Sequence, residues 1–529
     1  MSPRFSIVTP VFDPPIDAFR ACVASVLAQT CTDWEWILVD DCSTKADIRA
    51  ELRSVAARSA SIRLIERHSN GGIVASSNDG LAVASGEFVV LLDHDDELAP
   101  HALHENNMVI EEHPNVDYLY SDEDKIDEHG NHFGRFTKPD WSPERFRGQN
   151  YCSHLSVIRT SLIRDVGGFR PGFDGSQDYD LFLRVTEKAR AIAHIPLVLY
   201  HWRTVQGSTA LDPNAKPHAL DAARRAVQEH LDRVGIAGQV ETTPEFYLHT
   251  RRSLTRSPMV SIIIPTCGTE SRIWGRTMTL VETAVASIVQ RSTYQNYEIV
   301  VVYDTPITPD SVLSNLSTIA GDSLVLVPYS KPFNFAEKCN VGVAHSSGDA
   351  VILLNDDTQI LTPSWIEGLI GFLEEPDVGM VGPLLLLEDG RIQSAGHFFD
   401  GNGTHNAAFG HSASEKGPFS VLTIPAERSG LTMACVAIPR RVFELVGGIS
   451  LDFPRAFNDV DFGNKLTLHG YRMVWTPHVK IHHFESVSRD PTVKREETKM
   501  LWERWGRIVL GRDPYLPFFD FAIHGLDME

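Results

Sequence analysis

Short apolar runs alternate with longer amphipathic segments over the first hundred residues. The apolar runs have the length of buried strands, and the segments between them have the spacing of helices. The predicted strands cover residues 5–11, 34–39, 62–66 and 88–92. Strands that alternate with helices in this way predict a parallel, doubly wound sheet. In such a sheet the ligand lies beyond the carboxyl ends of the strands.

The same order of elements returns about 260 residues later. Strands are expected at 260–264, 298–302 and 350–354, and helices near 279–290 and 336–345. The first strand of each copy also matches in sequence, because Ser-Ile-Val-Thr-Pro in one copy corresponds to Ser-Ile-Ile-Ile-Pro-Thr in the other. An internal repeat of this length predicts two homologous domains.

The domain boundaries follow from changes in composition. We expect an N-terminal domain over 1–240, a linker over 241–258, a C-terminal domain over 259–490 and a helical tail over 491–529. The tail helix has apolar residues on one side with basic residues interspersed. It could lie on a membrane, but packing against the second domain is the more common arrangement for such a helix.

Charge and cysteine content restrict the function classes. The chain has 529 residues and a net charge of -21, which argues against a nucleic-acid partner because phosphate binding needs a basic face. Nucleotides remain compatible with this charge, since a divalent cation can bridge carboxylates to a diphosphate. The seven cysteines are scattered and indicate a reducing compartment. Without a signal pattern or an apolar run near ~20 residues, we expect a cytoplasmic protein, soluble or peripheral at the inner face of the plasma membrane.

Acidic residues follow the same predicted strand in each copy. Asp93 and Asp95 come after the strand ending at residue 92, and Asn355-Asp356-Asp357 follow its counterpart. Two carboxylates one residue apart at a strand end can both reach a hard cation. A solvated acidic turn explains a single pair equally well, but the repetition favours a metal site in which Asp357 corresponds to Asp95.

A later acidic pair also occurs twice. Asp178 and Asp459 each precede an apolar helix and follow a Gly-Gly-hydrophobic segment. A carboxylate that is partly shielded from water at a helix start can accept a proton from an attacking hydroxyl. The alternative is a helix cap. The recurrence favours the general base.

Two histidines and two strand-end aspartates complete the repeated set. His201 lies 23 positions after Asp178, and His483 lies 24 positions after Asp459. Each could complete the metal shell or bind a leaving phosphate, although His482 competes with His483 for this role. Asp41 and Asp304 follow the second strand of each copy, where a carboxylate suits recognition of a base or ribose.

Several nucleotide and hydrolase motifs are missing from the sequence. There is no Walker loop, no Gly-x-Gly-x-x-Gly at the first strand–helix turn and no Gly-x-Ser-x-Gly elbow. Kinase, ATPase, dehydrogenase and serine hydrolase functions therefore lose their main support.

Taken in order, the motifs resemble two tandem family 2 glycosyltransferases of the GT-A fold. The segments that carry the resemblance are Val39-Asp40-Asp41, Leu92-Asp93-His94-Asp95 and Tyr200-His201 in the first copy, and Phe333-Asn334-Phe335, Asn355-Asp356-Asp357 and Asn458-Asp459-Val460-Asp461 in the second. The resemblance implies an α/β chain of two Rossmann-like nucleotide-diphospho-sugar transferase domains with a short helical C-terminal tail. It also implies inverting transfer from a nucleotide-diphosphate sugar to a glycan or lipid-linked glycan of a bacterial surface polysaccharide.

The resemblance further assigns a role to each candidate residue. The general bases would be Asp178 and Asp459. The ligands of Mg²⁺ or Mn²⁺ would be Asp93, Asp95, His201, Asp357 and His483. The nucleotide-sugar site would contain Thr9, Pro10, Asp41, Asp93, Thr266, Asp304 and Asp356.

Two alternatives stay open at this point. One copy could be a non-catalytic glycan-binding module, with the second favoured because Asn355 and Tyr303 stand where the first copy has acids. A nucleotidyltransferase also uses a nucleotide, a metal and paired acids. The spacing of Asp178 and His201 and the lack of a basic phosphate-binding loop favour sugar transfer over it.

Overall fold

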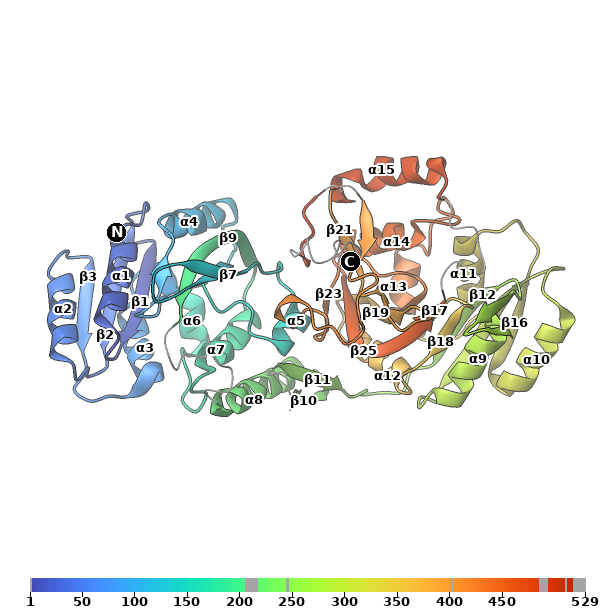
Figure 1. Ribbon diagram of the computed structural model, residues 1–529, viewed down its shortest axis with the longest axis horizontal. Coiled ribbons are helices and arrows are strands. Elements are labelled where there is room, and N and C mark those ends of the chain that lie inside the picture. The colour runs from blue at the N-terminus through green and yellow to red at the C-terminus, as the bar shows by residue number, and fades with distance from the viewer. Residues whose placement is uncertain are drawn as a thin grey trace. The chain divides into compact units, whose positions relative to one another are not determined.

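The chain forms two compact units, each with its own sheet (Figure 1). The computed structural model describes residues 2–204, 217–243, 247–401, 403–484, 493–509 and 511–516. The first unit comprises Met1–Trp141, Phe146–Gly235 and Gln239–Thr250. The second comprises Ser142–Arg145, Ile236–Gly238 and Arg251–Glu529.

The first sheet combines a parallel half with a mixed half. Its strand order is β3-β2-β1-β4-β8-β6-β9-β5, with β7 paired to β6. Strands β3, β2, β1 and β4 are parallel, and β8 then runs antiparallel to β4. The strands are β1 (Phe5–Val11), β2 (Trp34–Asp40), β3 (Ile62–Glu66), β4 (Phe88–Leu91), β5 (Glu97–Leu98), β6 (Tyr118–Ile126), β7 (His132–Phe136), β8 (Ser156–Arg159) and β9 (Ile192–Arg203). The helices are α1 (Ile16–Leu27), α2 (Ala46–Ala56), α3 (Gly72–Val83), α4 (Ala102–Glu112), α6 (Thr160–Val166), α7 (Gln177–Thr186) and α8 (Pro217–Val234).

The second sheet repeats this topology. Its order is β16-β15-β12-β17-β24-β19-β25-β18, with β20 paired to β19 and β23 to β25. The strands are β12 (Val260–Thr266), β15 (Tyr297–Asp304), β16 (Leu324–Tyr329), β17 (Ala350–Leu354), β18 (Thr358–Ile360), β19 (Val378–Leu386), β20 (Ile392–Ser394), β23 (Ala426–Glu427), β24 (Cys435–Pro439) and β25 (Arg472–His483). The helices are α9 (Leu280–Arg291), α10 (Asp310–Ala320), α11 (Phe335–Ala344), α12 (Trp365–Ile370), α13 (Arg440–Leu445), α14 (Asn458–Leu468) and α15 (Arg495–Val509), with 3₁₀ turns at Gly321–Ser323, Gly371–Glu374 and Pro418–Ser420.

The remaining elements are small. Two further pairs of strands belong to the second unit: β13 (Glu270–Ile273) with β14 (Arg276–Thr279), and β21 (His397–Phe399) with β22 (Thr404–Asn406). Helix α5 covers Pro143–Gly148. The stretch expected to be a linker contains strands β10 (Gly238–Thr242) and β11 (Leu248–Arg252), which pair with each other. Residues 244–246 of that stretch, including Pro244, lie outside the described residues.

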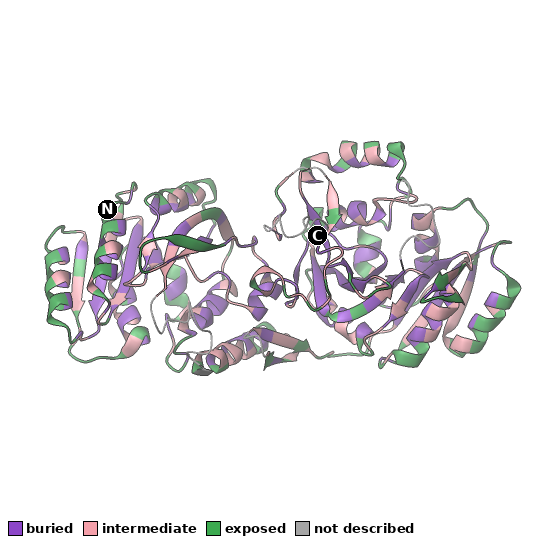
Figure 2. Cartoon of the chain, in the orientation of Figure 1, coloured by how far each residue is buried: buried purple, intermediate pink, exposed green. Residues whose placement is uncertain are grey.

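Continuous apolar strands form the core of each unit. All seven residues of β12 are buried, and so are the five of β17. Strands covered on both faces read as unbroken apolar runs because neither face meets water. In Figure 2 the central strands are purple, while the outer faces of α2, α9 and α10 are green.

A serine–glutamate bracket fixes the start of the parallel strands in both units. In the first unit, the Glu35 carboxylate accepts hydrogen bonds from Ser6 Oγ at 2.7 Å and from Ser85 N at 2.6 Å. In the second, Glu298 accepts from Ser261 Oγ at 2.7 Å and from Ser347 N at 2.6 Å. The repeat in sequence is therefore also a repeat of structure, down to single hydrogen bonds.

The tail helix packs on the second unit. Leu501, Trp505 and Val509 of α15 are buried in one cluster with Phe399 and Phe453. This arrangement is the more common of the two expected for the tail, and it covers the apolar side that membrane binding would use. Residues 510 and 517–529 lie outside the described residues. Among the described helices, none is both long enough and apolar enough to cross a bilayer.

We expect Leu501→Ala to destabilise the second unit by about 2–5 kcal/mol, because it removes a buried leucine and leaves a cavity. Lys499→Ala is the matched control on the same helix: its side chain is 74% exposed, and a surface change of this kind stays within about 0.5 kcal/mol. Urea unfolding followed by circular dichroism measures both. Equal midpoints for the two variants would contradict the packing of α15.

Candidate active sites

A pocket of about 270 Å³ opens at the carboxyl edge of the second sheet. Six residues predicted from the sequence line it: Thr266, Asp304, Asp356, Asp357, Asp459 and His483. They come from the ends of β12, β15, β17 and β25 and from the start of α14. They meet because β12 is parallel to both β15 and β17, so that the three strands end at the same edge.

A lysine that the sequence analysis did not single out organises the nucleotide side of this pocket. Lys338 Nζ lies 3.0 Å from Asp304 Oδ1 and donates a hydrogen bond to the carbonyl of Thr266 at 2.8 Å. The hydroxyl of Thr266 donates to Asp356 Oδ2 at 2.6 Å. Burial, reinforced by the carboxylate of Asp357, raises the pKa of Asp356 to about 7. Lys338 thus holds together the ends of two strands.

His483 faces the acidic strand end with a defined tautomer. Its Nε2 lies 3.2 Å from Asp357 Oδ1 and 3.2 Å from Asn355 Nδ2. Its Nδ1 donates to Gln393 Oε1 at 2.8 Å, so Nε2 is the nitrogen that accepts the hydrogen bond from Asn355 Nδ2. A hydrogen-bond partner on the far nitrogen is the usual way in which a ligating imidazole is oriented.

The second pocket fits a divalent cation. Asn355 Oδ1 is buried and has no hydrogen-bond partner among the described residues. An unsatisfied buried oxygen is costly unless something binds it. Asn355, Asp357 and His483 line the same pocket. Asn355 Oδ1, an Asp357 oxygen and His483 Nε2 would form a mixed oxygen and nitrogen ligand set for a cation that replaces the Asn355–His483 hydrogen bond.

Asp459 occupies the first turn of α14 but does not cap it. The N-cap position is Phe457, and no side chain caps the helix. Asp459 Oδ1 accepts a hydrogen bond from Val460 N at 2.9 Å, while Oδ2 lies 3.9 Å from His397 Nε2. Burial lowers the pKa of His397. The helix-cap alternative therefore does not describe Asp459, a residue that lines the pocket.

The first unit has a smaller pocket of about 70 Å³ at the corresponding edge. Its lining includes three predicted residues, Pro10, Asp93 and Asp178. Asp178 Oδ2 accepts a hydrogen bond from Asn150 Nδ2 at 3.0 Å, and burial raises the pKa of Asp178. The N-cap of α7 is Ser176, so Asp178 is not the cap either.

The acidic turn of the first unit is anchored by Asp96. Asp96 Oδ2 accepts from the Tyr200 hydroxyl at 2.5 Å, and Oδ1 accepts from Arg203 N at 2.7 Å. Burial and the carboxylates of Asp93 and Asp95 raise the pKa of Asp96 well above its usual range. Burial also raises the pKa of Asp95, whose carboxylate is not part of the pocket lining.

Two residues expected to bind the nucleotide make other contacts in the first unit. Thr9 Oγ1 accepts a hydrogen bond from Trp36 Nε1 at 3.0 Å inside the core. The carboxylate of Asp41 accepts from Gly71 N at 2.9 Å and Gly72 N at 2.8 Å, and it pairs with Arg67. Neither residue lines the pocket. Both side chains therefore make structural contacts, and their partners lie far away in the sequence.

His201 does not lie with Asp93, because the pairing of β9 turns it to the other face of the sheet. Glu97 pairs with His201 in the first unit, and Gln359 pairs with His482 in the second. Glu97 and Gln359 hold the same place after the acidic turn, so His201 corresponds to His482, and Trp202 corresponds to His483. The spacings of 23 and 24 positions already differ by this one residue. A shift of one residue moves a side chain to the opposite face.

His154 supplies the imidazole of the first pocket instead. Its ring nitrogen and the carboxylates of Asp93 and Asp96 lie within 4.8 Å of one another. The ring stacks on Tyr200 at 4.5 Å. Burial disfavours the charged imidazole, but the Glu123 carboxylate, 3.3 Å from His154 Nδ1, and the nearby aspartates outweigh it and raise the pKa of His154 to about 9.

The repeat could not reveal His154. Strand β8 pairs Arg159 with Phe88, and β24 pairs Pro439 with Ala350, so the counterpart of His154 is Ala434. An imidazole thus faces the acidic edge of each unit, but His483 comes from the end of β25 and His154 from the segment before β8.

Comparison with known proteins gives a consistent result. The family described as "Glycosyl transferase family 2" matches residues 6–167 and 261–395. The chain is 38% identical over 520 residues to an uncharacterized protein, y4gI, of Sinorhizobium fredii, covering 95% of this chain and 56% of that protein. It is 34% identical over 499 residues to the O-antigen biosynthesis protein RfbC of Myxococcus xanthus, covering 92% of this chain and 38% of that protein. The chain therefore spans about half the length, or less, of these relatives.

A solved structure of S. aureus TarS 1–349 with UDP-GlcNAc is 20% identical to this chain, with a TM-score of 0.36, covering 43% of this chain and 67% of that one.

Proposed function

Because the chain belongs to glycosyl transferase family 2, we propose that its units transfer a sugar from a nucleotide-diphosphate sugar to a hydroxyl group of a glycan or lipid-linked glycan. The family matches both units, so the predicted tandem pair of α/β glycosyltransferase domains is confirmed. The observation that carries the proposal is the second pocket, which gathers Asp357, His483 and Asp459 around one cavity. Similarity to an O-antigen biosynthesis protein supports a surface polysaccharide as the product.

In the second unit, Asp357, His483 and Asn355 would hold Mg²⁺ or Mn²⁺. The chemistry that a divalent cation would supply at this place is neutralisation of the charge on the leaving diphosphate. Thr266, Asp304 and Asp356 would line the nucleotide pocket, where Lys338 keeps the strand ends together. In the first unit, Pro10 and Asp93 would contact the donor, with Asp95 and His154 beside them.

Asp459 would act as the general base of the second unit. Its Oδ2 accepts the proton of the acceptor hydroxyl while the hydroxyl oxygen bonds to the anomeric carbon. The bond from that carbon to the diphosphate oxygen breaks on the opposite face, and the diphosphate leaves with the electron pair. Attack opposite the leaving group inverts the configuration. Asp178 would do the same in the first unit, where its raised pKa makes it a stronger proton acceptor.

A second candidate function is a chain with one active unit and one glycan-binding unit. The geometry favours the second unit as the active one, since its pocket measures about 270 Å³ against about 70 Å³ in the first. The sequence favours the opposite assignment, because Asn355 and Tyr303 stand where the first copy has acids. In the structure, Asn355 forms a hydrogen bond with His483. The first unit has Trp202 at the position that corresponds to His483.

We expect Asp178→Asn and Asp459→Asn each to lower sugar transfer by its own unit about 10²–10⁴-fold, because each removes a proton acceptor. Donor binding should remain nearly unchanged, since the amide keeps the shape of the carboxylate. Release of nucleoside diphosphate is measured over a panel of sugar nucleotides with Mn²⁺, and donor binding by calorimetry. Asp174→Asn and Asp322→Asn, at exposed positions, are the controls.

Loss of a different donor or linkage in each variant would show two active units. Loss in Asp459→Asn alone would assign the first unit to glycan binding. Full activity in both variants would overturn the assignment of the base.

Substitution of His483 tests the metal site and the strand register together. His483→Ala should raise the Mn²⁺ concentration needed for half-maximal activity of the second unit at least about 10-fold, since it removes a direct ligand. His482→Ala, the neighbour on the opposite face, should leave it close to wild type. An equal effect of both changes, or of neither, would argue against a cation bound at His483.

A further inference from the structure

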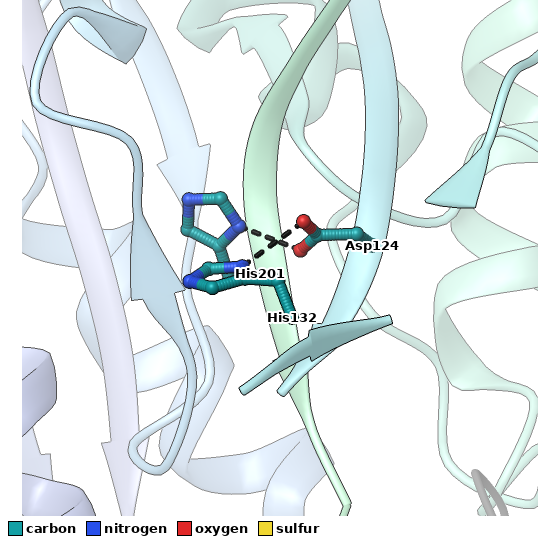
Figure 3. A group of neighbouring side chains, drawn as sticks. All are labelled: Asp124, His132 and His201. Atoms are coloured by element: carbon teal, nitrogen blue, oxygen red, sulfur yellow. Dashed lines mark hydrogen bonds and ion pairs between the residues drawn. The ribbon is translucent and has the colours of Figure 1, made fainter. Parts of the chain in front are cut away.

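Three side chains of the first unit meet away from its pocket. The carboxylate of Asp124 faces two neighbouring imidazole rings, and each of its oxygens contacts one of them (Figure 3). His201 Nδ1 lies 2.6 Å from Asp124 Oδ1, and His132 Nδ1 lies 3.0 Å from Asp124 Oδ2. The two rings are edge to face, with centroids 4.5 Å apart. The glycosyltransferase chemistry proposed above uses none of these three residues.

Strand pairing places the three residues on one face. Asp124 of β6 is paired with His201 of the parallel neighbour β9. Ile126 of β6 is paired with His132 of β7, which makes His132 a diagonal neighbour of Asp124. Diagonal neighbours are within reach of long side chains. The arrangement therefore follows from the sheet.

The turn before His132 is held rigidly. Asp127 Oδ1 accepts hydrogen bonds from His129 N at 2.9 Å and Asn131 N at 2.8 Å, and Asp127 Oδ2 accepts from Asn131 Nδ2 at 2.9 Å. These contacts fix the start of β7. His132 is thus presented to Asp124 by a formed turn.

We propose that Asp124, His132 and His201 bind a transition-metal ion of the Zn²⁺ type, separate from the Mg²⁺ or Mn²⁺ site. Two imidazole nitrogens and a carboxylate are ligands that suit Zn²⁺, whereas Mg²⁺ prefers an all-oxygen shell. Their ligand atoms all lie within 4.8 Å of one another. Tetrahedral zinc holds ligand atoms about 3.3 Å apart, so each histidine nitrogen needs to move away from its Asp124 oxygen, now at 2.6 Å and 3.0 Å, by less than about 1 Å. A water molecule would take the fourth position.

The site is reachable from solvent and independent of the pocket. The His132 side chain is 52% exposed, while those of Asp124 and His201 are 14% and 17% exposed. The neighbouring residue on β9, Tyr200, lines the pocket, and adjacent residues of a strand point to opposite faces. A bound ion would therefore tie β7 to β6 and β9 without touching the donor. Its role is structural.

The experiment uses the full chain, freed of metal by chelation, with Asp93→Asn and Asp357→Asn introduced to weaken the carboxylate-rich pockets. Zn²⁺ binding is followed by calorimetry and Co²⁺ binding by visible absorption, without any sugar nucleotide. We expect about one ion per chain and a Zn²⁺-dependent rise in melting temperature. Excess Mg²⁺ should not compete.

His132→Ala should weaken Zn²⁺ binding by more than the roughly 10–100-fold that loss of an outer-shell partner costs, and it should abolish the rise in melting temperature. His129→Ala is the control, because His129 belongs to the same turn and its side chain is 75% exposed. The metal-free melting temperatures of both variants check the fold. If His132→Ala is unfolded, His132→Gln is measured in its place.

The absence of Zn²⁺ binding in the parent chain would overturn the proposal and leave the three residues as a hydrogen-bonded network. Binding that survives in His132→Ala would also overturn it, because the ion would then sit elsewhere. Neither result bears on sugar transfer, since no donor is present. A failed transfer assay would in turn leave this site unaffected.

Discussion

Parallel pairing of a central strand with two neighbours is the constraint on which both units depend. Strands β1 and β12 each lie between two parallel strands, and the Ser–Glu brackets at Glu35 and Glu298 fix where these strands begin. Strands of matched start and similar length end at the same edge. The acidic residues that follow these strands therefore lie close together even where they make no contact with one another. The pockets open at that edge of the sheet.

The second acid of each later Asp-x-Asp pair supports the first. Asp180 and Asp461 are fully buried. Arg184 pairs with Asp180 at 2.6 Å, whereas Asp461 is bound by Trp505 Nε1 and Arg504 Nη1, each at 2.9 Å. Removing the partners of a buried carboxylate is strongly destabilising, so these contacts fix the helices that present the candidate bases. In the second unit the tail helix supplies them, which makes the tail part of the support of the site.

The two units reach the same kind of edge by different means. An imidazole faces the acidic turn in both, but His483 comes from the end of β25, and His154 precedes β8. At the place of His483 the first unit has Trp202, and at the place of His154 the second has Ala434. This exchange keeps an imidazole beside the acidic turn of each unit, while it changes the side chains around the pocket.

The sequence by itself determined the two α/β units, the strands and the acids at their ends, because apolar periodicity and strand ends are local properties of the chain. Only the tertiary structure decided what each polar side chain does there. Thr9 binds Trp36, Asp41 binds Arg67, and His201 turns to Asp124, since each partner comes from another strand or from the loop beyond it. The register of β9 decided the last of these. A shift of one residue moves a side chain to the opposite face of the sheet. The pattern of apolar and polar residues within a strand does not specify how that strand is paired with its neighbour.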